Sequence, residues 1–436
     1  MKKSLMSLVV VVAMVFTAAG VFATPVSPVK SVVSNYYDDY IKDLGYLVSI
    51  DSGTGNLDGS KKIAAYLQDK LEALGATVEF RDNDKGRHVI ARIKGEGKLR
   101  VLLSPHTDTV FDPGEAAKRP FAIEGTKGYG PGAGDCKASV VQMVYMAKAI
   151  NEIGIKNFGE IIIYFDAEEE TGSQTEEAIL EELAKQADLA LIVDGSRPNW
   201  GICTQRKGSA NYEIKVTGIQ GHAGNAPQAS ASAIMELANQ ITLLGKLNSP
   251  LPGNPKDFTA DALAAKNIKD HGQYIPDNWI NVGTITSTNS RVNRVADNAS
   301  AKIQLRSYKM SELERLDKEI KVLANKTLVP GTKVTIEGGI TGLPMEKTPK
   351  SVQVIDMYKD IVKREYNADV VEWIAGGMTV GNTTAKFIPT IDALGVEADP
   401  MLEHTEKEEV FLDTFIPRTV SLLELIDELS AKWPLK

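Results

Sequence analysis

Residues 161–173, IIIYFDAEEETGS, join an apolar run to a cluster of carboxylates. The first five residues suit a buried strand, and they lead directly into Asp166 and then into three glutamates at 168–170. Two unit charges about 4 Å apart repel each other by roughly 4 kcal/mol at an effective dielectric of about 20. A strand that ends in four acids therefore raises the question of what balances their charge.

The sequence around this stretch alternates between helix and strand patterns from about residue 30 to residue 206. Helical spacing is found at 59–75 and 137–151, and strand patterns are found at 77–81, 88–95, 99–104, 160–166 and 188–194. Apolar strands separated by helices are typical of a largely parallel sheet that is covered on both faces. We therefore predict an α/β fold of this kind.

The pattern changes between residues 208 and 342. The predicted elements are a strand at 210–218, a helix at 229–247, strands at 278–287 and 299–307, a helix at 311–328 and a strand at 332–338. This order is that of a ferredoxin-like α+β sandwich. The segment 249–276 is rich in Pro, Gly and charge and is interpreted as a loop or short helix within it.

The larger pattern resumes after residue 342. Helices are predicted at 351–366 and 411–433, and strands are predicted at 369–376 and 390–395. We therefore predict a discontinuous catalytic domain, residues 24–207 and 343–436, with residues 208–342 inserted into it as a second domain.

The N-terminal sequence MKKSLMSLVVVVAMVFTAAGVFA has two lysines, an apolar core and small residues before Ala23. It predicts a signal peptide, residues 1–23, that is cleaved on export. An uncleaved membrane anchor is disfavoured because the apolar run is short and no second span of about 20 residues follows. We therefore expect a periplasmic or secreted protein without a stable membrane anchor.

Charge and cysteine content exclude several classes of protein. The net charge is −8, and cleavage would remove Lys2 and Lys3 and leave a more acidic chain. Binding to nucleic acid is disfavoured because phosphates attract lysine and arginine. Cys136 and Cys203 permit one disulfide, but two cysteines are too few for a disulfide framework.

Candidate metal ligands follow the predicted strands. His106 and Asp108 come after the strand 99–104, and Asp194 ends another strand. Asp135 lies in the glycine-rich turn GPGAGD before a helix. In an open parallel sheet, ligands bind at the carboxyl ends of the strands, so these residues and the glutamate cluster are predicted to converge.

Each residue also has a simpler explanation. Asp135 would serve as a helix cap, the glutamates as a solvated loop or the first turn of a helix, and Asp194 as part of an Asp-Gly turn. Their joint occurrence instead suits zinc or a similar divalent ion, such as cobalt. His404, in MLEHTEKEEV, offers a further imidazole, whereas His88 and His271 carry no such signal.

These motifs resemble those of the two-zinc metallopeptidases that include glutamate carboxypeptidase (carboxypeptidase G2), peptidase T, acetylornithine deacetylase and succinyl-diaminopimelate desuccinylase. The resemblance spans nearly the whole mature chain, and the glutamate carboxypeptidase branch is most similar. The motifs that carry it are SIDSGTGNLDG, SPHTDTVF, GPGAGDCKAS, DAEEETGS, VTGIQGHAGNAP, GGMTVGN and EHTEKEEV.

The resemblance implies two Zn²⁺ ions per subunit. His106 and Asp194 would bind one zinc, His404 and Glu170 would bind the other, and Asp135 would bridge the pair. A water shared by the two ions would attack an amide bond.

The resemblance also implies roles around the metal ions. Glu169 would be the general base, and Asp108 would orient the imidazole of His106. His222 would stabilise the oxyanion, and Asn293 and Arg306 would bind the substrate. The inserted domain, residues 208–342, implies a homodimer, since it usually dimerises in this family.

Two departures weaken the expectation of a C-terminal glutamate in the substrate. The region TIEGGITGLPME, residues 335–346, contains no arginine where glutamate carboxypeptidases carry one for the substrate. Val380 stands where an aspartate is common.

We predict an exported metallopeptidase that acts on a peptide or an N-acyl amino acid. The alternatives are a deacylase or a di/tripeptidase of the same family and, from another class, a binding protein on a peptidase scaffold. A nucleotide-binding enzyme is disfavoured, because GPGAGD lacks the G-x-G-x-x-G spacing directly after a strand.

Overall fold

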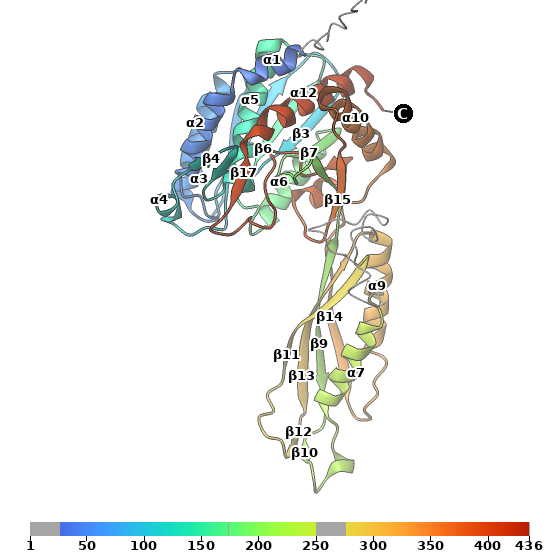
Figure 1. Ribbon diagram of the computed structural model, residues 1–436. Helices are drawn as coiled ribbons and strands as arrows, with labels where there is room; N and C mark the ends of the chain where they lie inside the picture. The colour runs from blue at the N-terminus through green and yellow to red at the C-terminus, as the bar shows by residue number, and fades with distance from the viewer. Residues whose placement is uncertain (1–26, 173, 250–275, 436) are drawn as a thin grey trace, which may run out of the picture.

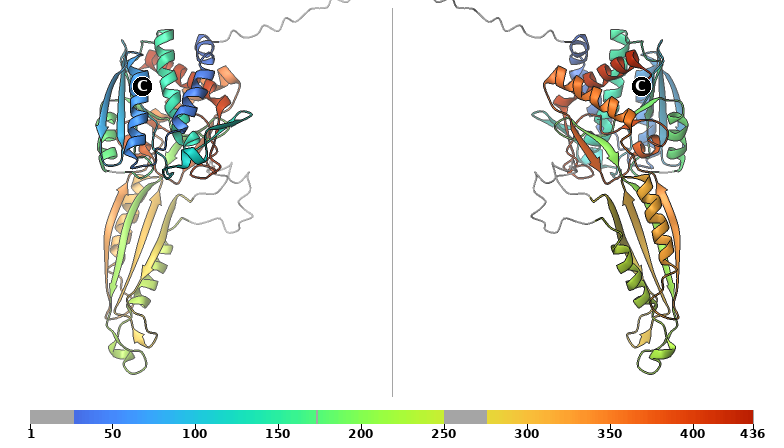
Figure 2. Two further views of the ribbon diagram at one scale, coloured as in Figure 1. Left: turned by 90° about the vertical axis from the view of Figure 1, so that its left-hand side faces the viewer. Right: turned by 90° about the vertical axis from the view of Figure 1, so that its right-hand side faces the viewer.

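A computed structural model describes residues 27–172, 174–249 and 276–435. The predicted signal peptide and most of the predicted loop 249–276, with His271, lie outside the described residues. Figures 1 and 2 show a larger body with layers of helices around a sheet, and a narrow, elongated body that extends from it.

The larger body is built on a six-stranded sheet in the order β1-β2-β6-β3-β7-β16. Its strands are β1 (Thr77–Asp82), β2 (Arg87–Lys94), β3 (Arg100–Ser104), β6 (Glu160–Phe165), β7 (Leu189–Ile192) and β16 (Thr390–Ile391). Strands β6, β3, β7 and β16 run parallel, whereas β2 runs antiparallel to both of its neighbours. The predicted, largely parallel sheet is therefore confirmed, with β2 as the strand of opposite direction.

Helices cover both faces of this sheet (Figure 1). One face packs against α1 (Pro28–Ser34), α2 (Tyr37–Val48), α3 (Leu57–Glu72), α5 (Ala138–Ile153), α10 (Pro349–Tyr366) and α12 (Phe415–Lys432). The other face packs against α6 (Gln174–Ala184) and α11 (Val380–Thr384). In β6, Ile161 and Ile163 point to the first face and Ile162 and Tyr164 to the second, so the strand is buried on both sides.

Several short elements complete the larger body, and sequence patterns did not predict them. They are α4 (Glu115–Lys118), β4 (Ala122–Glu124), β5 (Lys127–Tyr129), β8 (Gly201–Arg206) and β17 (Glu409–Phe411). Strand β17 pairs with β5, and β8 pairs in parallel with the predicted strand β15 (Val371–Ala375). The three-residue strands β4, β5 and β17 carry too little periodicity to be recognised, and the sequence of β8, GICTQR, has no alternation of apolar and polar residues.

The elongated body has its own antiparallel sheet in the order β11-β13-β9-β14. Its main elements are β9 (Gly208–Thr217), α7 (Ala233–Gly245), β11 (Asn278–Thr286), β13 (Asn298–Ser307), α9 (Met310–Leu323) and β14 (Lys333–Gly342). A separate apolar core joins α7 and α9 to one face of the sheet. At its far end, β10 (Gly221–His222) pairs with β12 (Arg294–Val295).

The chain crosses between the two bodies twice, and α11 contacts both crossings. The side-chain amide of Asn382 donates to the main-chain oxygens of Lys207, 3.1 Å away, and Leu343, 2.8 Å away. Asn382 is buried, and its two hydrogen bonds hold both crossings against α11.

No helix among the described residues is both long and apolar enough to cross a membrane.

Candidate metal centre

Asp135 lies between two histidines that are far apart in the sequence. Its Oδ1 is 2.7 Å from His106 Nε2, and its Oδ2 is 3.0 Å from His404 Nε2. One carboxylate thus presents one oxygen to each imidazole.

Two groups of potential ligands meet at this carboxylate. His106, Asp135, Cys136 and Asp194 form one group, and Asp135, Glu170 and His404 form the other. Within each group the ligand atoms all lie within 4.8 Å of one another. The structure therefore brings together the five residues that the sequence predicted as metal ligands.

The sheet positions these residues at its carboxyl-end edge. His106 follows β3 and forms a parallel bridge with Asp166, which follows β6. Asp194 follows β7, and its carboxylate is 3.6 Å from His106 Nε2. His404 comes from a C-terminal loop with a backbone φ of +63° and lies 3.2 Å from Glu170. Such a φ is uncommon outside glycine and often marks a functional site.

The groups fit a pair of divalent cations. His106 Nδ1 is 3.1 Å from the main-chain oxygen of Asp108, which can only accept, so Nδ1 donates there and Nε2 is the nitrogen directed at Asp135 and available to a metal ion. The Oε1 atom of Glu170 is buried and has no hydrogen-bond partner among the described residues. Imidazole nitrogens and carboxylate oxygens at this spacing are the donors that zinc uses.

The electrostatics of the cluster favour positive charge. Hydrogen bonds to Asp135 and Glu170 raise the pKa of His404 to about 11. Burial alone would raise the pKa of Asp135, but His106 and His404 hold it well below its usual value. The carboxylates thus stabilise a cation, and bound metal ions would supply that charge.

Glu169 lies beside this centre in a different environment. It lines a small cavity together with His106 and Asp194. Burial, and after it the charges of Asp194, Glu170 and Asp135, raises the pKa of Glu169 well above that of an exposed glutamate. A carboxyl group of raised pKa beside metal ligands is suited to exchanging protons.

A model of peptidase family M20/M25/M40 matches residues 102–428, most of the chain. The chain belongs to this family.

Individual relatives agree with the family match. Carboxypeptidase G2 from Pseudomonas sp. (strain RS-16) is 27% identical over 400 residues, which cover 90% of this chain and 89% of that protein. Succinyl-diaminopimelate desuccinylase from Janthinobacterium sp. (strain Marseille) is 25% identical over 337 residues, 74% of this chain and 83% of that protein. The predicted resemblance is confirmed, and the chain is a metallopeptidase or amidohydrolase of the M20 family.

A solved structure supports the fold. The aminopeptidase PepT from Bacillus cereus ATCC 10987 matches with a TM-score of 0.72 at 20% identity, covering 90% of this chain and 98% of that one.

In this M20 chain, Asp108 joins the two halves of the centre. Its Oδ1 is 3.4 Å from His106 Nδ1. Its carboxylate also accepts hydrogen bonds from the main-chain N–H groups of Glu169, at 3.2 Å, and Glu170, at 3.3 Å. Thr54 donates to the same carboxylate at 2.6 Å. Asp108 therefore fixes the turn that carries both glutamates as well as the imidazole.

His88, which carried no signal in the sequence, accounts for the rest of the carboxylate cluster. It is fully buried, with Nδ1 3.2 Å from Asp166 and Nε2 3.5 Å from Glu168. The hydroxyl of Tyr164 lies 2.8 Å from Nδ1. Burial alone would raise the pKa of Asp166, but its contact with His88 lowers it. Asp166 and Glu168 are thus partners of His88, Glu170 belongs to the group of potential metal ligands, and Glu169 is in neither set.

Glu408 is a second residue that the sequence did not reveal. Its buried carboxylate accepts hydrogen bonds from the main-chain N–H groups of Gly132, at 3.3 Å, and of Gly134 and Asp135, both at 3.0 Å. Burial and the nearby Asp135 raise its pKa to about 7. It lies in an acidic stretch, EKEEV, in which no pattern distinguishes it from its neighbours.

Both cysteines are buried and free. The thiol of Cys136 contacts the backbone of His106, accepting from its N–H at 3.1 Å and donating to its carbonyl at 3.2 Å.

Two cavities flank the turn that carries Glu170. The Met378 cavity, about 310 Å³, lies between residues 169–172 and the end of β14, with Met378 on its wall. The Val110 cavity, about 750 Å³, is lined by residues 53–58 and 109–113 together with Glu170 and Thr171. Glu170, one of the proposed metal ligands, lines both cavities, so each borders the metal centre.

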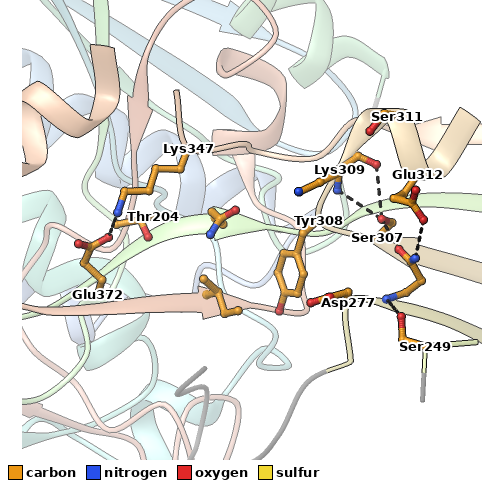
Figure 3. Close-up of a pocket in the computed structure, with 13 residues that line it drawn as sticks. Thr204, Ser249, Asp277, Ser307, Tyr308, Lys309, Ser311, Glu312, Lys347 and Glu372 are labelled. Atoms are coloured by element: carbon orange, nitrogen blue, oxygen red, sulfur yellow. Dashed lines mark hydrogen bonds and ion pairs between the residues drawn. The ribbon is translucent and has the colours of Figure 1, made fainter. Parts of the chain in front are cut away.

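A third cavity, about 570 Å³, lies at the junction of the two bodies around Tyr308 (Figure 3). Lys347 and Glu372 form an ion pair on one side of it, and Ser307 and Asn278 are hydrogen-bonded on the other. None of the predicted site residues lines this cavity.

The three predicted residues of the elongated body do not join the centre within one chain. His222 is exposed in β10, at the far end of that body (Figure 1). Asn293 lies beside it, since its main-chain oxygen accepts from Ala223 at 3.0 Å. Arg306 lies near the junction instead, opposite Ser209 of β9.

Arg306 is part of a polar row on the open face of that sheet. Its Nε donates to Gln304 Oε1 at 3.0 Å, and Gln304 donates to Asn211 at 3.1 Å. Its Nη1 is buried without a hydrogen-bond partner among the described residues, and burial lowers its pKa.

Proposed function

We propose that this chain is an exported exopeptidase of the M20 family that hydrolyses an amide bond at a pair of zinc ions. The observation that carries the proposal is the Asp135 carboxylate, which presents one oxygen to His106 and the other to His404. His106 and Asp194 would hold one ion, and Glu170 and His404 the other, with Asp135 shared. When bound, two such cations lower the pKa of water and polarise the substrate carbonyl.

Glu169 supplies the proton transfers in this proposal. Its carboxylate takes a proton from the attacking water and delivers it to the leaving amine. The amide C–N bond breaks, and the products are a carboxylate and an amine. The raised pKa of Glu169 suits both halves of this exchange.

The proposed substrate is a peptide or an N-acyl amino acid with a free carboxylate. Arg306 would bind this carboxylate, because a guanidinium with an unpartnered N–H can donate to a carboxylate oxygen. Carboxypeptidase G2, a relative over 90% of this chain, supports a carboxypeptidase-like activity. A deacylase or a di/tripeptidase is the alternative within the family.

We also propose a homodimer formed through residues 208–342. His222 and Asn293 lie too far along the elongated body to serve the centre of their own chain in this arrangement (Figure 1). In a dimer with two-fold symmetry, each could reach the centre of the partner chain. His222 would then stabilise the oxyanion there, and Asn293 would contact the substrate.

The decisive experiment combines metal analysis with an amide panel. Purified protein should contain about two zinc ions per chain and should hydrolyse at least one member of a panel of N-acyl amino acids and peptides. A chelator should abolish hydrolysis and lower the melting temperature, and zinc should restore both, since metal binding stabilises the folded state. Zinc content without hydrolysis of any amide would favour a binding protein instead.

Export is proposed from residues 1–23 and is tested separately. Cells that produce the full chain should release a form that begins at Thr24 into the periplasm or the medium, as shown by fractionation and intact mass. A full-length protein in the membrane fraction would contradict cleavage.

A further inference from the structure

The Val110 cavity has walls of a particular chemistry. Two of its apolar side chains are unusually exposed, with Leu57 38% and Val110 44% accessible. It also includes the carboxylates of Asp58 and Asp112, and no lysine or arginine lines it. Neither aspartate forms an ion pair with a residue in the described parts of the chain.

The basic residues close to this side are already paired. Lys118, whose charge acts on Asp112, forms an ion pair with Glu115 at 2.7 Å. The guanidinium of Arg119 lies 4.5 Å from the ring of Phe111, another wall residue, and is paired with Glu115 at 3.1 Å. The wall of the cavity therefore combines exposed apolar side chains with two carboxylates and has no cation of its own.

The position of Arg306 indicates which side of the scissile amide each of the two cavities would hold. The Met378 cavity contains the end of β14, and Met378 accepts a hydrogen bond from Ser209, which lies opposite Arg306. The carboxylate of the leaving amino acid, directed to Arg306, would lie on that side of Glu170. The acyl side of the scissile amide would then enter the Val110 cavity.

We infer that the Val110 cavity is the acyl-side subsite and that it selects apolar acyl groups without negative charge. This inference rests on the proposed function. An apolar acyl group that covers Leu57 and Val110 gains binding free energy, because apolar surface of both the group and the side chains is removed from water. An anionic acyl group would be repelled by Asp58 and Asp112 with no cation on the wall to offset them.

The test uses three acyl derivatives of the amino acid that the amide panel shows to be released fastest. N-butyryl and N-succinyl derivatives have acyl chains of equal carbon number that differ in one carboxylate, and the N-acetyl derivative is shorter. For the zinc-loaded protein, kcat/KM for the butyryl derivative should exceed that for the succinyl derivative by about tenfold or more. It should also exceed that for the acetyl derivative by about tenfold.

Paired variants assign these preferences to the cavity. The double variant Asp58→Asn and Asp112→Asn should reduce the butyryl-to-succinyl ratio to about threefold or less, mainly through the KM for the succinyl compound. Asp69→Asn, an exposed acid on the same helix outside the cavity, should leave the ratio unchanged. Val110→Ser should reduce the butyryl-to-acetyl ratio, whereas Ile123→Ser, an exposed apolar residue in β4, should not.

The outcomes separate the inference from the proposed function. Cleavage of the succinyl derivative at least as fast as the butyryl derivative, or ratios that none of the cavity variants changes, would overturn the inference alone. Failure of the zinc-loaded protein to cleave all three derivatives would overturn the proposed function and the inference with it.

Discussion

Neighbouring carboxyl groups at the metal centre have opposite properties because their surroundings differ. Asp135 contacts two imidazoles, which hold its pKa well below the usual value and keep it ionised as a ligand. Glu169 is half-buried beside other carboxylates, and the loss of water together with their charges raises its pKa and suits it to proton transfer. Pairs of titratable groups whose pKa values are pushed apart in this way commonly divide binding and acid–base roles.

The variant Glu169→Gln should therefore separate metal binding from turnover. We expect zinc content to stay unchanged and kcat to fall by about 100-fold or more, because the amide cannot accept the proton of water. Glu182→Gln, an exposed residue of α6 that lines none of the cavities described above, is the matched control and should retain full activity. Normal turnover by Glu169→Gln would refute the assignment of the base.

The variant His88→Ala tests whether His88 compensates the negative charge of the buried acids that follow β6. Removing the imidazole leaves Asp166 and Glu168 buried without this partner, so the free energy of unfolding should fall by about 3–5 kcal/mol in urea titrations. Tyr164→Phe removes the hydroxyl that lies 2.8 Å from His88 and 3.5 Å from Asp166, and it should cost about 1 kcal/mol. A loss in His88→Ala no larger than that in Tyr164→Phe would show that other groups balance these charges.

At the level of elements, the metal centre depends on loops that pack against the ends of strands. The glycine-rich loop before α5 carries Asp135, and Glu408 binds three main-chain N–H groups of this loop from the segment before β17. Glu408 is thus a positioning residue: it orients the bridging carboxylate without being one of the proposed ligands.

Glu408→Gln should loosen this loop. Loss of the charge that accepts these hydrogen bonds should weaken zinc affinity by about 10–100-fold, as changes to the hydrogen-bond partners of metal ligands commonly do. Competition with a fluorescent chelator measures this affinity without an activity assay. Glu406→Gln, an exposed neighbour, should bind zinc as tightly as the unmodified protein. Equal affinities for the two variants would contradict the role of Glu408.

At the scale of the whole molecule, the elongated body separates residues that one reaction is proposed to use. Arg306 lies near the junction with the larger body, whereas His222 and Asn293 lie at the opposite end of the sheet (Figure 1). A complete site therefore requires a second chain in the proposed dimer.

Mixing two inactive variants tests this requirement. His222→Ala and Glu169→Gln should each be inactive alone, but a mixed dimer contains one centre that has Glu169 from one chain and His222 from the other. Random exchange of subunits should restore about a quarter of the unmodified activity, since half of the dimers are mixed and each has one intact centre of two. No recovery in samples that light scattering shows to be mixed dimers would overturn the shared site.

The sequence by itself determined the large features of this protein. Continuous apolar runs such as Ile161–Phe165 suit strands that are buried on both faces, and the structure has this strand buried on both sides. The acids and histidines that follow such strands are predicted to meet because parallel strands end at one edge. The predicted long helices and strands match the structure to within a few residues, although α2 and α6 were not predicted. The five predicted metal ligands lie together in the structure: His106, Asp135, Glu170, Asp194 and His404.

Only the tertiary structure decided the surroundings of these residues. His88 and Glu408 have no local pattern, because their roles depend on contacts with Asp166 and with the loop before α5 that are distant in the chain. The reversed direction of β2 depends on pairing with β6, and the opposite positions of His222 and Arg306 depend on the length of a folded sheet. Local sequence determines which residues are apolar or charged. The neighbours that set the pKa and the orientation of each side chain depend on how distant segments pack together.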